Sequence, residues 1–145
     1  MKIAEILSRS ELFSELPSET LDEIANICHS REISKGEFVF QIGDPSNDLF
    51  ILAEGALDIG FGIMSAEQSD GGMIKEPGEV FGWSALVGET NFRMINAIGV
   101  RQTRLIVLNG TELMNLLEGH PRAGFAFLRK LLAVILNRIV SVAAT

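Results

Sequence analysis

The sequence has one cysteine, two histidines and no long hydrophobic run, and each scarcity excludes a class of protein. Cys28 has no second cysteine with which to form an internal disulfide or a thiolate metal cluster. The longest clearly apolar block, residues 131–136, is far shorter than the roughly 20 residues that span a membrane. The first residues, Met1-Lys2-Ile3-Ala4-Glu5, lack the long apolar segment of a signal peptide. The sequence therefore predicts a soluble, cytoplasmic protein without membrane contact.

The two histidines do not form a recognisable catalytic or metal motif. His29 and His120 both lie outside the glycine-rich middle of the chain, where a metal-dependent β-barrel enzyme would place its ligands. His29 follows Cys28, but the two do not suggest a Cys–His catalytic pair, because adjacent residues of a helix do not face each other. Gly60-Phe61-Gly62 lacks the following helix of a dinucleotide-binding fingerprint. We therefore expect no catalytic residue, no metal site, no cofactor and no enzymatic activity.

The charge balance is acidic, with 12 Lys and Arg against 19 Asp and Glu and a net charge of −7. Non-specific nucleic-acid binding depends on clustered basic residues. Arg101 and Arg104 are the nearest approach to a pair in the middle of the chain, and a solvated strand face explains them. We expect no direct nucleic-acid partner.

A chain of 145 residues with 47% hydrophobic residues fits a single domain, 1–145. Its first part, 1–30, reads as short helices. Pro17 suits a helix start because proline has no N–H to donate there. Ser18 is a possible cap, and Thr20 with Glu23 three residues later is a competing one. Apolar residues then recur at helical spacing at Leu21, Ile24, Ala25 and Cys28.

The middle part, 31–108, consists of short apolar runs separated by glycines, a pattern typical of strands joined by tight turns. Gly43-Asp44-Pro45 is a turn signal, and Ser69-Asp70-Gly71-Gly72 reads as a hairpin tip. The sequence therefore predicts an α+β, mainly β fold: a double-stranded β-helix or jelly-roll-like β-roll, flanked by N-terminal helices and a long C-terminal helix. The expected strands include 38–40, 49–52, 57–59, 73–74, 95–98 and 105–108.

The last part, 109–145, returns to helical spacing. Asn109 with Glu112 three residues later is a cap candidate for a short helix, and Gly119-His120-Pro121 ends it. A long helix from about Pro121 has an apolar arc wider than that of an ordinary surface helix. We expect one part of the arc to pack on the roll and the rest to contact a second copy, as a homodimer, or a domain absent from this chain; the alternative is that the short helices cover it all. The apolar arc consists of Phe125, Leu128, Leu132, Ile135, Ile139 and Val142, with Phe127, Leu131 and Val134 beside them.

One segment carries chemistry: Glu79-Val80-Phe81-Gly82-Trp83-Ser84-Ala85-Leu86, followed by Arg93. Gly82 permits close backbone approach. Small residues follow it and allow a short helical turn with free N–H groups. Such groups together with a guanidinium form a receptor for phosphate. The segment therefore predicts a site for a small anion.

Along the chain come helices, glycine-punctuated strands, the segment at Gly82, a short helix and a long helix. In this order the chain resembles the cyclic nucleotide-binding domain family over about Leu12 to Ile139. The resemblance is to the effector domain of catabolite activator protein-like regulators, without the DNA-binding part. Arg93 lies eleven positions after Gly82, as in that family. The other matching segments are Lys35-Gly36-Glu37, Gly43-Asp44, Asp48-Leu49-Phe50-Ile51-Leu52-Ala53-Glu54-Gly55 and Gly78-Glu79-Val80-Phe81-Gly82.

The resemblance implies a regulatory ligand-binding domain for cyclic AMP, cyclic GMP or another small anion. Arg93 takes the position that pairs with the cyclic phosphate, and the backbone N–H groups of Ser84 and Ala85 complete the anion site. Ligand binding would reposition the C-terminal helix, because the ligand has different affinities for two helix positions. The implied ligand-binding residues are Phe81, Gly82, Trp83, Ser84, Ala85, Leu86, Arg93 and Met94.

The sequence departs from the family pattern at three positions. Trp83 replaces a glutamate that accepts a hydrogen bond from the ribose 2′-hydroxyl, and an indole is a donor only. A hydrogen bond to a charged group contributes about 1.5–3 kcal/mol, so its loss weakens binding roughly ten- to hundredfold. Met94 and Ile95 replace a small hydroxyl residue and an alanine. The alternative hypothesis is therefore a ligand-free dimerisation or protein-interaction module whose pocket is plugged by Trp83 and Met94.

Overall fold

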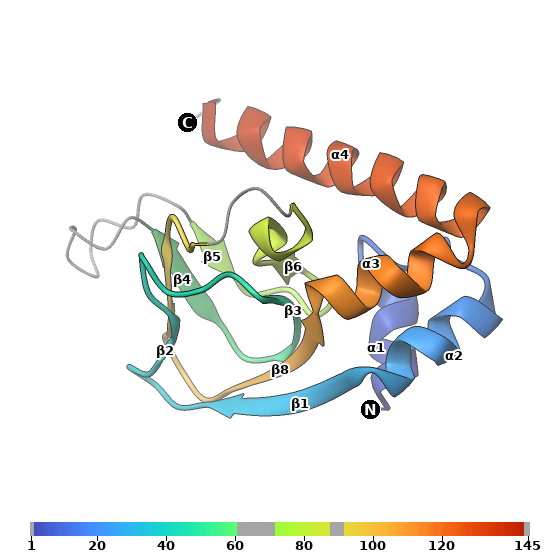
Figure 1. The fold of residues 1–145 in the computed structure, drawn as a ribbon. Coiled ribbons are helices and arrows are strands. Elements are labelled where there is room, and N and C mark those ends of the chain that lie inside the picture. Colours follow the sequence, from blue (N-terminus) through green and yellow to red (C-terminus); the bar gives the residue numbers. More distant parts are fainter. Residues whose placement is uncertain (1, 61–71, 88–91, 144–145) are drawn as a thin grey trace.

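The computed structural model describes residues 2–60, 72–87 and 92–143 (Figure 1). Side chains are described as far as residue 138. The expected hairpin tip at 69–71 and the side chains of Ile139 and Val142 lie outside these limits.

The described residues form four α-helices, one short 3-10 helix and eight strands. The helical elements are α1 (Ile3–Arg9), α2 (Ser18–Asn26), η1 (Trp83–Leu86), α3 (Gly110–Glu118) and α4 (Pro121–Ala143). The strands are β1 (Cys28–Ile33), β2 (Phe38–Phe40), β3 (Asp48–Glu54), β4 (Leu57–Gly60), β5 (Met73–Ile74), β6 (Val80–Phe81), β7 (Asn96–Gly99) and β8 (Thr103–Asn109).

The strands form two four-stranded antiparallel sheets, ordered β1-β8-β3-β6 and β2-β7-β4-β5. Figure 1 shows them as a roll, with α1, α2 and α3 gathered at one end and α4 running as a rod along one side. The predicted class, an α+β and mainly β fold with a β-roll and a long C-terminal helix, is confirmed.

The two central strands of the first sheet, β3 and β8, are buried on both faces, which explains why they read as continuous apolar runs. In β3, Phe50 and Leu52 face the second sheet, whereas Leu49 and Ile51 face the helices. The same alternation places Phe81 of β6 inside the roll. The roll-interior cluster comprises Ile33, Val39, Phe40, Phe50, Leu52, Leu57, Ile59, Ile74, Phe81, Ala97, Leu105 and Val107.

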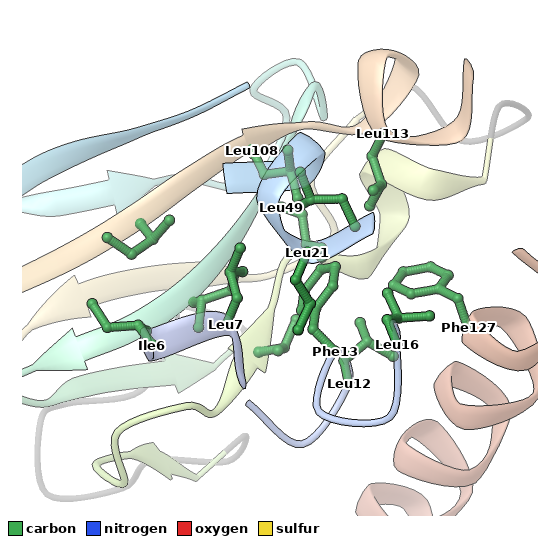
Figure 2. Close-up of a cluster of buried hydrophobic side chains, with 14 of the residues drawn as sticks. Ile6, Leu7, Leu12, Phe13, Leu16, Leu21, Leu49, Leu108, Leu113 and Phe127 are labelled. Atoms are coloured by element: carbon green, nitrogen blue, oxygen red, sulfur yellow. The ribbon is translucent and has the colours of Figure 1, made fainter. Parts of the chain in front are cut away.

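A second cluster, the helical cluster, lies between the first sheet and the helices (Figure 2). Phe127 of α4 enters it next to Phe13, with ring centroids 5.3 Å apart. The buried part of α4 therefore belongs to a cluster that includes the N-terminal segment as well as strands of the roll. The other members of the helical cluster are Ile6, Leu7, Leu12, Leu16, Leu21, Ile24, Leu49, Ile51, Val80, Ile106, Leu108, Leu113, Leu117 and Leu131.

The N-terminal helices differ from the prediction in two details. Helix α2 begins at Ser18 with Pro17 as its N-cap residue, and no side chain caps it, so neither predicted cap is present. Cys28 begins β1 and pairs with Leu108 of β8, so the strand region starts before residue 31. Pairing with β8 overrides the helical spacing that Cys28 continues.

The C-terminal helices agree with the prediction. Asn109 caps α3, because its Oδ1 accepts a hydrogen bond from the Glu112 N–H at 2.9 Å. Helix α4 starts at Pro121, as predicted. Among the described helices, none combines the length and the apolar character that crossing a bilayer requires.

Candidate functional site

The candidate anion site is built around the turn Gly82–Leu86, which follows β6 and consists of Gly82 and the short helix η1. Gly82 has a φ of 84°, in the left-handed region that favours glycine. A Cβ at Gly82 would lie 3.0 Å from both Arg93 Nη1 and the Asp48 carbonyl oxygen. Glycine is therefore required here both by the backbone conformation and by the close approach of Arg93.

Arg93 is held in place by the turn that follows β2. Its N–H donates to the Asp44 carbonyl at 2.8 Å, and its own carbonyl accepts from the Gly43 N–H at 2.9 Å. Pro45 and Phe92 form an isolated antiparallel bridge beside these bonds. The predicted Gly43-Asp44-Pro45 turn therefore fixes the backbone of the predicted site arginine.

The Arg93 side chain lies inside the roll and is 3% exposed. Its Nη2 donates to the Asp48 carbonyl at 2.5 Å and its Nη1 to the Gly82 carbonyl at 3.3 Å. Its Cζ lies 4.2 Å from the ring centroid of Phe40 and 5.5 Å from that of Phe50. The guanidinium is thus directed at the start of the Gly82–Leu86 turn and stacked on aromatic rings.

The charge of Arg93 is only partly compensated. Burial lowers the pKa of Arg93 to about 10, against the opposing effect of the nearby Asp48 and Asp44. The group therefore stays charged at neutral pH. The hydrogen bonds described for its side chain go to neutral carbonyls, and its buried Nε has no partner among the described residues. A buried cation with a spare donor is suited to an incoming anion.

The backbone of the Gly82–Leu86 turn is partly committed. The Ala85 N–H, which the resemblance assigns to the anion, donates to the Gly82 carbonyl at 3.2 Å, so an anion would have to replace this bond. The Ser84 hydroxyl lies 2.5 Å from that of Ser46, which is buried. Sequence reasoning missed Ser46, whose nearest signal is the preceding Gly43-Asp44-Pro45 turn.

Trp83 lies on the helix side of the turn. Its ring packs against the helical cluster, as does Leu86, and Arg138 Cζ of α4 lies 5.1 Å from the ring centroid. The indole Nε1 is buried and has no partner among the described residues. This placement contradicts the prediction that Trp83 plugs the roll interior.

Of the remaining predicted site residues, one lies inside the roll and the other is exposed on its surface. Phe81 is buried in the roll-interior cluster and stacks on Phe50, with centroids 5.2 Å apart. Met94 is 66% exposed, so it does not plug the interior as predicted. Ile95 instead packs against the roll-interior cluster. The structure therefore brings Phe81, Gly82 and Arg93 together and places Met94 outside.

The histidines do not build a metal site in the part of the chain that is described. No group of three or more His, Cys, Asp or Glu residues there has metal-binding geometry. His29 lies in β1. His120 Nε2 lies 2.6 Å from Glu23 Oε2 and links the α3–α4 turn to α2.

Comparison with known proteins places this geometry in a family. The family model described as the cyclic nucleotide-binding domain matches residues 30–120. A protein of Rhodopseudomonas palustris named as a potassium channel protein is 31% identical over 117 residues. That alignment covers 80% of this chain and 27% of the relative, so the chain spans about a quarter of that relative's length.

Two solved structures share the fold. One, described as a cyclic nucleotide-binding protein from Geobacter metallireducens, has a TM-score of 0.79 and 23% identity, covering 96% of this chain and 99% of the other. The other, the catabolite activator protein of Thermus thermophilus, has a TM-score of 0.74 and 24% identity, covering 93% of this chain and 61% of the other.

Proposed function

The chain belongs to the cyclic nucleotide-binding domain family, and from this premise we propose that it is a regulatory domain that binds cyclic AMP, cyclic GMP or a related anion at Arg93. The observation that carries the proposal is the buried Arg93 guanidinium, whose hydrogen bonds go to two neutral carbonyls and whose Nε has no described partner. A phosphate offers stronger, charge-assisted acceptors than these carbonyls. In this proposal the domain has a regulatory and not a catalytic role, and it is located in the cytoplasm.

Binding in this proposal exchanges one set of Arg93 contacts for another. An anion beside the Gly82–Leu86 turn would accept from Arg93 in place of the Gly82 carbonyl, which lies 3.3 Å from Nη1. The Gly82 carbonyl also accepts from the Ala85 N–H, so the turn would rearrange when the anion arrives. The ligand would then act on whatever element packs against the turn.

Titration calorimetry of the full chain with cyclic AMP and cyclic GMP tests the proposal. We expect micromolar binding of one of them, abolished by Arg93→Ala. Arg101→Ala is the matched control, because Arg101 is exposed and its guanidinium also bonds a carbonyl, that of Gly55. Absence of heat at millimolar nucleotide with the protein folded would exclude both ligands.

The output of the domain is proposed to pass through α4 to a second copy of the chain. Four large apolar side chains of α4 are between 41% and 66% exposed, at a spacing of three and four residues typical of a helix–helix seam. The same stripe supports the second candidate function, an interaction module that works without a ligand. The four residues are Phe125, Leu128, Leu132 and Leu136.

A further inference from the structure

Two arginines hold the segment Val80–Trp83 from opposite sides. Arg93 reaches it from the roll interior, with Nη1 3.3 Å from the Gly82 carbonyl. Arg138 of α4 reaches it from the helix side, with Nη2 3.3 Å from the Val80 carbonyl and Cζ 5.1 Å from the Trp83 ring centroid. The contacts of both arginines therefore fall within four consecutive residues, 80–83.

Arg138 docks into a carboxylate pair that the backbone already organises. Its Nη2 lies 3.3 Å from Glu11 Oε1 and 3.3 Å from Glu79 Oε2. The Glu79 carboxylate also accepts from the Glu76 N–H at 2.9 Å, and Glu11 Oε1 accepts from the Val80 N–H at 3.2 Å. Because these bonds do not involve α4, the two acids form a prepared receptor for a cation on that helix.

We propose that Arg138 is a positioning residue that couples the state of Arg93 to the placement of α4, with Trp83 as the contact between them. The inference rests on the proposed function of Arg93 as the partner of an anion. When the anion accepts a hydrogen bond from Nη1 of Arg93, the Gly82 carbonyl loses that donor. The short helix η1, which begins at Trp83, then shifts. The Arg138–Trp83 contact shifts with it, and α4 follows.

Trp83 is suited to this role by its chemistry. A guanidinium stacks on aromatic faces, and among aromatic side chains tryptophan attracts a cation most strongly. The Trp83 ring also packs against the helical cluster to which α4 contributes Phe127. Coupling between two sites is reciprocal. If ligand binding at Arg93 displaces α4, then displacing α4 must also change the affinity for the ligand.

The test of the contact uses Trp83 fluorescence, which is specific because the chain has a single tryptophan. In the full chain, we expect Arg138→Gln to raise the acrylamide quenching constant of Trp83 about twofold, and Arg138→Lys to raise it less. The control is Arg129→Gln, since Arg129 lies on the same helix with its Cζ 5.9 Å from the Phe125 ring centroid. An unchanged constant in Arg138→Gln would overturn the proposal.

The test of the coupling is a double-mutant cycle that needs no ligand. Urea unfolding is measured for Arg93→Met, Arg138→Gln and the double variant, with Arg93→Lys in place of Arg93→Met if the latter does not fold. We expect the combined change in the unfolding equilibrium constant to depart from the product of the single changes by more than about threefold. A cycle that pairs the Arg93 variant with Arg129→Gln should be multiplicative. Multiplicative behaviour in the Arg138 cycle would contradict the coupling.

The failure of this inference differs from the failure of the proposed function. If neither cyclic AMP nor cyclic GMP binds while the Arg138 cycle is non-multiplicative, the nucleotide is wrong and the coupling stands. If cyclic AMP binds in calorimetry but saturation leaves Trp83 emission and quenching unchanged, the coupling is wrong and the ligand stands.

Discussion

The direction of a single side chain, that of residue 83, decides how the site departs from its family. Trp83 contacts Arg138 on the helix side of the Gly82–Leu86 turn, whereas Arg93 is buried inside the roll. The substitution therefore removes an acceptor from the ligand side and adds an aromatic contact on the α4 side. Under the proposed function, this one change would weaken the contact to the ribose and strengthen the contact to α4.

Restoring the carboxylate tests this account. We expect Trp83→Glu alone to raise the affinity for cyclic AMP by less than about tenfold, because Arg138 attracts the new carboxylate. Trp83→Glu combined with Arg138→Gln should raise it by about tenfold or more, since the glutamate is then left to the ribose. Calorimetry against the Arg138→Gln parent measures the gain.

The control for that gain is Trp83→Leu in the same Arg138→Gln background. Leucine removes the indole without supplying an acceptor. If leucine improves cyclic AMP binding as much as glutamate does, the lost carboxylate is not the reason for weak binding.

At the scale of elements, the Gly82–Leu86 turn depends on its packing against α3. Gly110, the first residue of α3, would place a Cβ 2.1 Å from the Ala85 carbonyl oxygen. We expect Gly110→Ala to lower the free energy of unfolding by about 1–3 kcal/mol, as overpacking does, when measured by urea unfolding. Gly119→Ala is the control and should change it by less than about 1 kcal/mol, because its φ is −74° and its nearest contact is 3.3 Å. Equal losses in the two variants would argue against a tight turn–helix contact.

The cap of α3 gives a second prediction at this scale. Asn109→Ala removes the acceptor for the Glu112 N–H and should lower the free energy of unfolding by about 1 kcal/mol in thermal or urea unfolding. Asn115→Ala, on the exposed face of the same helix, should be neutral or slightly stabilising. A loss in Asn115→Ala as large as that in Asn109→Ala would mean that the loss is not specific to the cap.

The same elements show what the sequence can and cannot predict. The runs of β3 and β8, the Asn109 cap and the start of α4 at Pro121 are local patterns, and the structure confirms them. Strand β1 was not among the expected strands; its first residue, Cys28, continues a helical period and becomes part of a strand only by pairing with β8. Two-residue β6 is too short for a periodic signal.

The proximity of Gly82 and Arg93 was predictable from the sequence, but the directions of the side chains around them were not. The spacing of Gly82 and Arg93 identified both members of the predicted pair, and Arg93 Nη1 does reach the Gly82 carbonyl. The backbone of Arg93 is held by the distant Gly43-Asp44-Pro45 turn, which its own neighbours in sequence do not reveal, and the adjacent Met94 is exposed. The contacts of Arg138 are invisible in sequence, because its partners are Glu11 and the segment 79–83, which lie far from it along the chain.

At the scale of the whole molecule, α4 is the element with an inner and an outer face. Its inner residues, Phe127, Leu131 and Val134, are buried, whereas its outer stripe is exposed along the same length. An apolar seam of this kind is favourably covered by an identical seam, because a two-fold axis brings each residue to a matching apolar surface. Arg138 fixes the helix that carries the stripe, so its network would set the orientation of a dimer.

The prediction at this scale concerns mass in solution. We expect the wild-type chain to sediment as a dimer at tens of micromolar, and Leu132→Glu with Leu136→Glu to sediment as a folded monomer, because charges in an apolar seam are desolvated without partners. Met94→Glu is the matched control: Met94 is 66% exposed and Leu132 62% exposed, but Met94 lies on the roll, away from the stripe. It should leave the dimer intact. A wild-type chain that is monomeric at these concentrations, or a Met94→Glu variant that dissociates as readily, would remove α4 as the dimer seam and leave its outer face to a different partner.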